Sequence, residues 1–183
     1  MLDGLLLGVV TALLTGGRLR NLEHLELRGG PILLAALLAQ VFLPRIVTET
    51  GLPPWAELGV FWIVPALIAM TVAALNWRQP GMGLVAVGIG LNLVVVVLNG
   101  GMPVSLASVS TMMAESAGSA LERSWLHIPA SSATNLLFLA DVIPVPGPTW
   151  HRGLVSLGDI LMSAGVGYWT FVAMHEPGDS DAG

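Results

Sequence analysis

The sequence predicts an all-α integral membrane protein, folded as one bundle of five transmembrane helices. Hydrophobic residues make up 54% of its 183 residues and charged residues only 10%, so polar side chains are too few to cover a water-soluble globule. The apolar residues are gathered into runs of about twenty, the length that a helix needs to cross a bilayer. Glycine, proline, tryptophan and arginine separate these runs, as is typical of membrane interfaces. We therefore expect lipid to surround the bundle.

The bundle is expected to occupy residues 1–176, followed by a disordered acidic tail at 177–183. The expected spans cover residues 2–17, 31–47, 56–76, 82–98 and 154–173, with an outer cap of helical and irregular structure at 99–152. The first span is short, because about sixteen residues reach only ~24 Å, so Asp3 should lie at one interface and Arg18 at the other. After it, Leu19, Leu22 and Leu25 are separated by charged residues. This pattern predicts an interfacial helix that lies along the membrane surface.

Several positions inside the spans indicate how the helices pack. Pro65, near the centre of the third span, predicts a kink. In the fourth span, Gly88 and Gly90 should lie against a neighbouring helix, because small residues let two backbones approach closely. Gln40 and Asn92 are amides in apolar surroundings, where an unpaired polar group is costly. Hydrogen bonding between helices is their more ordinary role, and contact with a ligand is the alternative.

The fourth span is followed by residues that stop a helix and turn the chain. Asn99, Gly100 and Gly101 suit a helix end and a sharp turn, and Pro103 forbids helical continuation. Because Asn99 follows Asn92 by seven residues, the two amides share nearly the same helix face. Ser105 can then cap a further helix at 106–121, whose apolar residues recur with the helical period.

Two aspartates stand beyond this turn. Asp141 is a lone carboxylate among apolar residues, and Ser156 and Asp159 have the spacing of a capping box at the start of the last span. A cap or a local turn is the structural interpretation of both aspartates. The functional interpretation is that they converge with Asn99 at the outer end of the bundle, where the five-span topology brings these segments together.

This outer patch is the candidate ligand-binding site, and it comprises Asn99, Gly100, Gly101, Ser105, Asp141, Ser156 and Asp159. Two carboxylates at a partly desolvated mouth favour a cation, a protonated pair or a hydroxyl-rich headgroup. We therefore expect binding of a small ligand, an ion or a lipid headgroup. A structural or accessory subunit of a membrane complex is the alternative. An enzyme that uses His127 or His151 with the aspartates is a minor alternative, because that spacing is unspecific, and no catalytic residue, metal or cofactor is assigned.

Composition also limits the partners. The absence of cysteine excludes disulfides, thiol catalysis and cysteine-based metal sites. The net charge of −5 and the lack of a basic cluster argue against nucleic-acid binding. The lipid bilayer is the expected partner, and a membrane protein or a second copy of the chain remains open.

The arginines predict the orientation. In a five-span bundle, one side of the membrane has Arg18, Arg20, Arg28 and Arg78. The other side has Arg45, Arg123 and Arg152. The larger group should be cytoplasmic. This places the amino terminus outside the cell membrane, the carboxyl terminus in the cytoplasm, and the cap outside.

Five short motifs recur in one known family. They are Gly16-Gly17-Arg18, Gln40, Asn99-Gly100-Gly101 followed by Met102-Pro103-Val104, Asp141 before Ile143-Pro144, and Ser156-x-Gly158-Asp159. Together they resemble the bacterial domain-of-unknown-function family five-three-one-seven, small multi-pass membrane proteins, over nearly the whole chain. Ala140 stands where that family has glycine. The resemblance implies a multi-pass fold and the polar patch, but no activity, substrate or cofactor.

Overall fold

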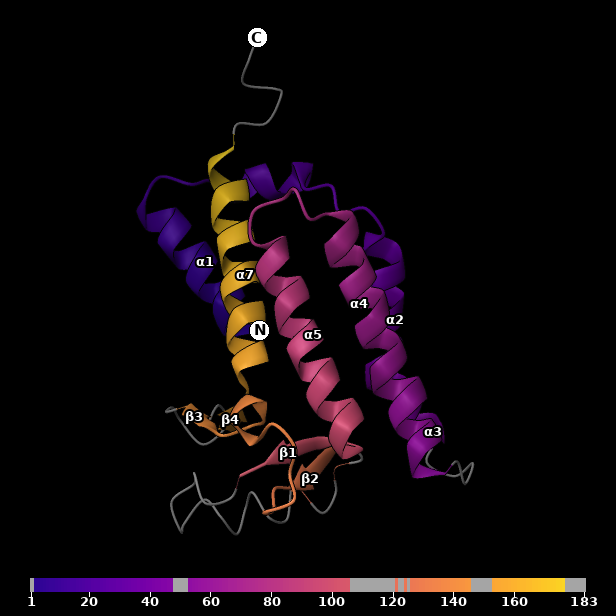
Figure 1. Ribbon diagram of the computed structural model, residues 1–183. Coiled ribbons are helices and arrows are strands. Elements are labelled where there is room, and N and C mark those ends of the chain that lie inside the picture. Colours follow the sequence, from indigo (N-terminus) through magenta and orange to yellow (C-terminus); the bar gives the residue numbers. More distant parts are fainter. Residues whose placement is uncertain are drawn as a thin grey trace.

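The computed structural model describes residues 2–47, 53–105, 121, 124, 126–145 and 153–176. The fold is mostly helical (Figure 1). Its helical elements are α1 (Leu2–Leu14), the 3-10 helix η1 (Leu19–His24), α2 (Gly30–Val47), α3 (Pro54–Leu58), the π-helical turn η2 (Gly59–Ile63), α4 (Val64–Leu75), α5 (Met82–Asn99), the 3-10 helix η4 (Leu137–Leu139) and α7 (Leu157–His175). Four short strands, β1 (Met102–Val104), β2 (His127–Pro129), β3 (Ile143–Val145) and β4 (Gly153–Val155), lie at one end of the bundle.

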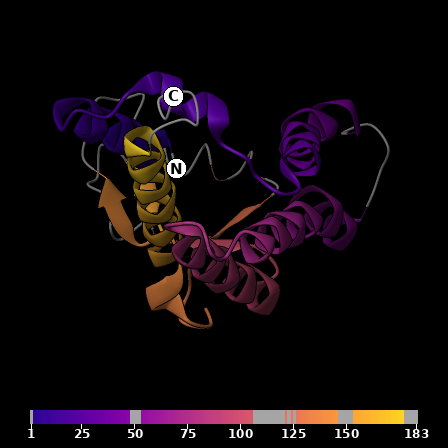
Figure 2. The same ribbon diagram turned by 90° about the horizontal axis from the view of Figure 1, so that it is seen from above.

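Helix α7 is packed between α1 and α5, while α4 joins α5 to α2 (Figure 2). Gly81 of α5 lies against Gly165, and Gly88 against Gly158, so α5 and α7 run in opposite directions. Helix α1 runs parallel to α7, because its successive contacts are with Ser163, Gly167 and finally His175.

Glycines set the distance between α5 and α7, but only one of the two predicted α5 glycines takes part. A Cβ added to Gly88 would lie 2.5 Å from the Gly158 carbonyl oxygen, so no side chain fits there. A Cβ on Gly90 would meet nothing within 4 Å. The expectation that Gly90 faces a helix is therefore wrong: it lies two residues, about 200° around the helix, from Gly88.

Glycines also allow close packing of α1 on α7. A Cβ added to Gly4 would collide with the backbone of Ser163, and one on Gly8 with the backbone of Gly167. This small-xxx-small pair on each helix brings the two backbones into contact. Because Gly4 lies beside Ser163, α1 begins opposite the second turn of α7.

Among the described residues, three helices are long and apolar enough to cross a membrane: Trp55–Leu75, which combines α3, η2 and α4, Met82–Asn99, and Leu157–His175. Asp3–Leu14 and Gly30–Pro44 are shorter apolar helices. The hydrogen-bonding pattern of the first long helix changes at η2, directly before the predicted Pro65 kink, where proline lacks the N–H that an α-helix requires.

Two predicted boundaries are corrected. The last long helix begins at Leu157 rather than at 154, because Gly153–Val155 is a strand, β4, paired antiparallel with β3. The predicted interfacial helix after the first span is one short 3-10 element, Leu19–His24, packed on α7. Leu25 ends it in an extended conformation.

The cap, which we define as the described residues 102–105, 126–145 and 153–155, contains strands that the sequence did not predict. Strand β1 pairs parallel with β2. Met102, Leu139 and Ala140 pack with Val95 and Val96 of α5 in a common hydrophobic core. The cap is thus anchored on the last two turns of α5. The predicted helix at 106–121 and the acidic tail at 177–183 fall outside the described residues, apart from Leu121.

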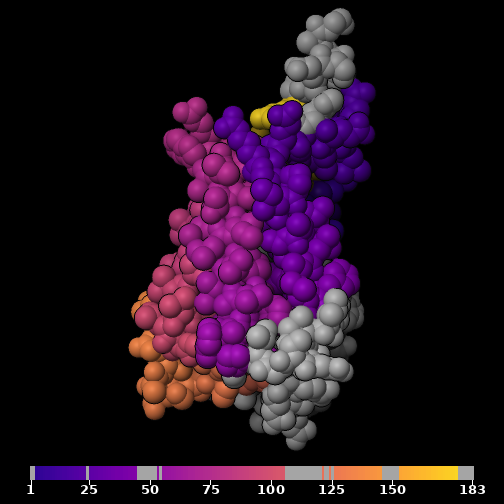
Figure 3. Space-filling model, turned by 90° about the vertical axis from the view of Figure 1, so that its right-hand side faces the viewer, coloured from indigo at the N-terminus to yellow at the C-terminus, as the bar shows by residue number. Residues whose placement is uncertain are grey.

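Large apolar side chains remain exposed along the sides of the bundle. Leu14 is 81% exposed, Leu7 66% and Ile32 63%. Figure 3 shows α2 (violet) side by side with α4 and α5 (magenta) on one such face, above the cap. Exposed apolar surface of this extent is typical of a helix bundle in contact with lipid.

Candidate functional site

A hydrogen-bonded cluster joins α5 to the first turn of α7. Ser156 Oγ accepts the Asp159 N–H, and the Asp159 carboxylate accepts the Ser156 N–H, both at 3.0 Å. This is the capping box that the spacing predicted. Asn92 completes the cluster: its Nδ2 donates to Asp159 Oδ1 and its Oδ1 accepts the Ser156 hydroxyl, both at 2.9 Å. Asn92 therefore makes the hydrogen bonds between helices that were expected of it.

The cluster lies inside the bundle rather than at its end. Ser156 is fully buried, and Asn92 is only 5% exposed. Asn92 precedes the last residue of α5 by seven residues, ~10 Å along the axis. A Cβ on Gly158 would overlap the Asn92 amide, so glycine lets the start of α7 pass directly beside it. Asp159 is therefore recessed about two turns below the end of α5.

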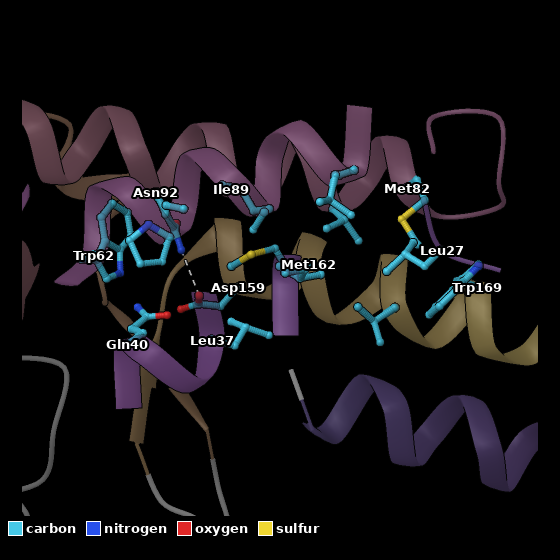
Figure 4. Close-up of a pocket in the computed structure, with 18 residues that line it drawn as sticks. Leu27, Leu37, Gln40, Trp62, Met82, Ile89, Asn92, Asp159, Met162 and Trp169 are labelled. Carbon is cyan, nitrogen blue, oxygen red and sulfur yellow. Dashed lines mark hydrogen bonds between the residues drawn. The ribbon is translucent and has the colours of Figure 1, made fainter. Parts of the chain in front are cut away.

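A partly open cavity of about 280 Å³ begins at this cluster and continues along the inside of the bundle (Figure 4). It is lined by Leu27, Leu33, Leu37, Gln40, Trp62, Pro65, Ala66, Ala69, Val72, Ala73, Met82, Val85, Ile89, Asn92, Asp159, Met162, Val166 and Trp169. These residues come from α2, η2, α4, α5 and α7 and from the chain before α2. Asp159 is the one charged side chain among these lining residues.

The polar groups of the cavity gather at one end. Figure 4 shows Gln40, Trp62, Asn92 and Asp159 together there, with the Gln40 amide directed toward Asp159. Within the described part of the chain, neither the Gln40 amide nor the Trp62 indole N–H makes a hydrogen bond. Gln40 therefore does not make the interhelical bonds expected of it, and its amide is free to meet a bound molecule.

The opposite end of the cavity is apolar and closed by hydrogen bonds behind it. Asn76, which is 3% exposed, accepts the Arg28 N–H at 3.0 Å and donates to the Arg28 carbonyl at 2.9 Å. Trp169 Nε1 donates to Gln79 Oε1 at 2.7 Å. The Asn76–Arg28 bonds fix the chain before α2 to the end of α4, and the Trp169–Gln79 bond joins α7 to the segment after α4. Leu27 is thereby held across the end of the cavity.

Asn99, Gly100 and Gly101 lie apart from this cluster and shape the turn into the cap. Asn99 Nδ2 donates to the Asn135 carbonyl at 3.1 Å, and Asn99 Oδ1 accepts the Asn135 N–H at 2.8 Å. Gly100 has a φ of 72°, which suits glycine after a helix. A Cβ on Gly101 would lie 2.7 Å from the Leu126 carbonyl oxygen, so β1 can begin beside β2 only with glycine there.

Asp141 and Ser105 lie together in the cap, joined through their backbones. The Asp141 N–H donates to the Pro103 carbonyl at 3.0 Å, and the Ser105 N–H donates to the Asp141 carbonyl at 3.1 Å. Asp141 thus continues the pairing along β1, as its bridge with Val104 also shows. The local-turn interpretation of Asp141 is wrong, because its backbone partners are almost forty residues away along the chain.

Asp141 is 6% exposed, and its Oδ1 has no hydrogen-bond partner within the described structure. Its Oδ2 lies 3.6 Å from His127 Nε2, and His127 Nδ1 is hydrogen-bonded to Ser124 Oγ at 2.8 Å. Burial, with a smaller contribution from the charge of Asp159, raises the pKa of Asp141 to about 7. Burial also lowers the pKa of His127, against the opposite effect of Asp159.

The structure thus separates the predicted patch into three parts: the cluster of Ser156 and Asp159 with Asn92, the Asp141–Ser105 strand pairing, and the Asn99–Gly101 turn. Within the described residues, no group of three histidine or acidic side chains has the arrangement of a metal site. Sequence reasoning missed Trp62, which lines the cavity, and Asn76, which lies behind its apolar end. Asn76 could have been found as an amide at the end of an apolar run, next to Trp77.

Comparison with known proteins gives the same family as the motifs. The model of a family of unknown function (DUF5317) matches residues 24–171, and the chain belongs to this family. An uncharacterized protein of Thermotoga maritima is 28% identical over 169 residues, which cover 91% of this chain and 87% of that protein. No solved structure matches the chain.

Proposed function

We propose that the protein is a five-span membrane protein that binds an amphiphilic molecule, with an alkyl chain in the cavity and a polar group at Gln40, Asn92 and Asp159. The observation that carries this proposal is the cavity itself, which is apolar along its length and polar at one end. Single-chain amphiphiles have the same distribution of polarity. At ~30 Å³ for each water-sized group, about 280 Å³ gives room for one alkyl chain.

Helix directions support five spans. In a chain that crosses the membrane five times, the first and last spans run parallel and the fourth runs opposite to the last. Helices α1, α7 and α5 have these directions. The Asn76–Arg28 bonds place the start of α2 beside the end of α4, as antiparallel neighbours require. The shorter α1 and α2 are then the first and second spans.

The cavity can be tested by filling it. Ala69 lines it and Ala74, on the same helix, is exposed and does not. A neutral chain with a terminal bromine, ω-bromoundecanol, should enter and quench Trp169 at the apolar end. We expect saturable quenching in the native protein but not in Ala69→Phe, whose side chain fills the cavity. Two separate single variants are the controls: Ala69→Val and Ala74→Phe each leave most of the space free and should keep the saturable quenching.

The contribution of Trp169 to the quenching is measured as the difference between the native protein and the Trp169→Phe variant. Quenching that is linear in probe concentration, or equal in Ala69→Phe and Ala74→Phe, would contradict ligand binding in the cavity. Stoichiometric co-purification of another membrane protein would then favour the accessory-subunit alternative.

A further inference from the structure

We propose that the polar group of the bound amphiphile is a protonated amine, held by Asp159, Gln40 and Trp62. This inference rests on the proposed function, since it names the class of ligand for the same cavity. It is argued from the charge, the hydrogen-bonding capacity and the aromatic face at the polar end.

Charge is the first argument. Asp159 is the one charged side chain among the residues that line the cavity. Its two carboxylate oxygens already accept the Asn92 Nδ2–H and the Ser156 N–H, and these neutral donors leave its negative charge without a cation in the cavity. A carboxylate or phosphate headgroup would be repelled there. A cationic group would be attracted, more strongly than in water because the surroundings are apolar.

Hydrogen-bonding capacity is the second argument. An ammonium group has three donors and no acceptor. Two acceptors meet at the polar end: an Asp159 oxygen, which accepts one bond already and retains a free lone pair, and Gln40 Oε1, whose amide has no partner within the described structure. Asn92 Oδ1 is turned toward the Ser156 hydroxyl and Gly158, which do not line the cavity. A primary amine can donate to both acceptors at once, whereas an alcohol donates only one bond.

Trp62 gives the third argument. Its indole lies beside Gln40 at the same end of the cavity (Figure 4). Tryptophan provides the most favourable aromatic face for a cation. An aromatic ring, a carboxylate and an amide oxygen around one position form a set of groups that favours an ammonium ion over a neutral or anionic headgroup.

The test compares headgroups on one tail. The probes are ω-bromoundecylamine, ω-bromoundecanol and ω-bromoundecanoic acid, added to the full-length protein in phosphatidylcholine nanodiscs at pH 7, with quenching of Trp169 as the signal. We expect the amine to bind about tenfold more tightly than the alcohol, a difference of ~1.4 kcal/mol, and the acid to bind most weakly. In Asp159→Asn the advantage of the amine should disappear, while the affinity for the alcohol stays within about twofold, because the asparagine side-chain oxygen can still accept the Ser156 N–H.

The outcomes separate the two proposals. If all three probes bind equally, or if the amine keeps its advantage in Asp159→Asn, the amine inference is wrong and the cavity remains a binding site. If none of the probes binds saturably, the proposed function itself is wrong. If the Asp159→Asn variant binds none of the three probes while the native protein binds them, Gln40→Leu is measured as well. This second variant removes one acceptor and leaves the capping box intact. A selective loss of amine affinity there supports the inference, and an unchanged affinity for all probes overturns the assignment of Gln40.

Discussion

The two aspartates show how differently one residue type behaves in two surroundings. Asp159 accepts the Ser156 N–H, as the Ser156-x-x-Asp159 spacing predicted, because a capping box is formed within four residues. The donor on its other oxygen, Asn92, comes from α5. Asp141 lies against β1, and its Oδ1 has no partner within the described structure. Its burial could not be predicted, since it depends on pairing with a strand almost forty residues earlier.

Burial of Asp141 predicts a pH-dependent stability. Its pKa in the folded protein is about 7, above the usual value of a carboxyl group, so the native state binds more protons than the unfolded state between about pH 4 and pH 7. Stability should therefore fall as pH rises through this window, by at most ~4 kcal/mol at ~1.4 kcal/mol for each pKa unit. The prediction is that the melting temperature in detergent falls less between pH 5 and pH 8 in Asp141→Asn than in the native protein.

His127 contributes in the opposite direction at the acidic end, because its lowered pKa makes stability rise with pH below its usual value. The comparison is therefore repeated with His127→Gln present in both proteins. Glu23→Gln, at an exposed position, is the control for a general loss of negative charge. An equal pH dependence with and without Asp141 would show that its carboxyl group is solvated.

At the scale of elements, the small residues of α5 and α7 decide which faces meet. The sequence indicated close packing on α5 and predicted that both Gly88 and Gly90 face a neighbouring helix. The sequence could not distinguish a glycine that faces lipid from one that faces another helix, because lipid and the protein interior are equally apolar. Both kinds of glycine stand among the same apolar residues. The structure selects Gly81 and Gly88.

Gly88→Ala and Gly90→Ala form a matched pair that tests this selection. The new methyl group at position 88 would lie 2.5 Å from the Gly158 carbonyl oxygen, whereas position 90 is open within 4 Å. We expect Gly88→Ala to destabilise the protein by about 1–3 kcal/mol through overpacking. Gly90→Ala should stabilise it by ~0.5–1 kcal/mol, because alanine favours helix. Unfolding of both variants in mixed micelles measures the difference, and the reverse order would mean that α7 packs on the other face of α5.

At the scale of the whole molecule, the mostly helical class could be predicted from the sequence. The bounds of three helices, α2, Trp55–Leu75 and α5, could be predicted to within a few residues, since each is an apolar run with clear breaks. Gln40 and Asn92 were also identified as polar positions of interest. The cavity between them could not be predicted, because it depends on how far α2 stands from α7. The strands of the cap were missed because each has only three residues, too few for an alternating pattern.

The orientation proposed from arginine counts gives a prediction for the complete bundle. The chain has no cysteine, so a single introduced thiol can be labelled without background. Glu23 and Ser132 are exposed near opposite ends. With an impermeant maleimide on intact cells, Ser132→Cys in the cap should be labelled and Glu23→Cys should react only after the cells are opened. Labelling of Glu23→Cys alone on intact cells would reverse the proposed orientation.

The placement of α2 also determines how a ligand would reach the cavity. Helix α2 packs on α4 and η2, and α7 packs on α1 and α5, so α2 and α7 stand as facing walls with the partly open cavity between them. In the proposed five-span arrangement this seam opens sideways into the acyl chains, while the cap lies over the aqueous end. A ligand would then dissolve in the bilayer before it binds. Occupancy would then follow the mole fraction of ligand in the membrane, so adding inert lipid at a fixed total amount of ligand would lower that mole fraction and empty the site.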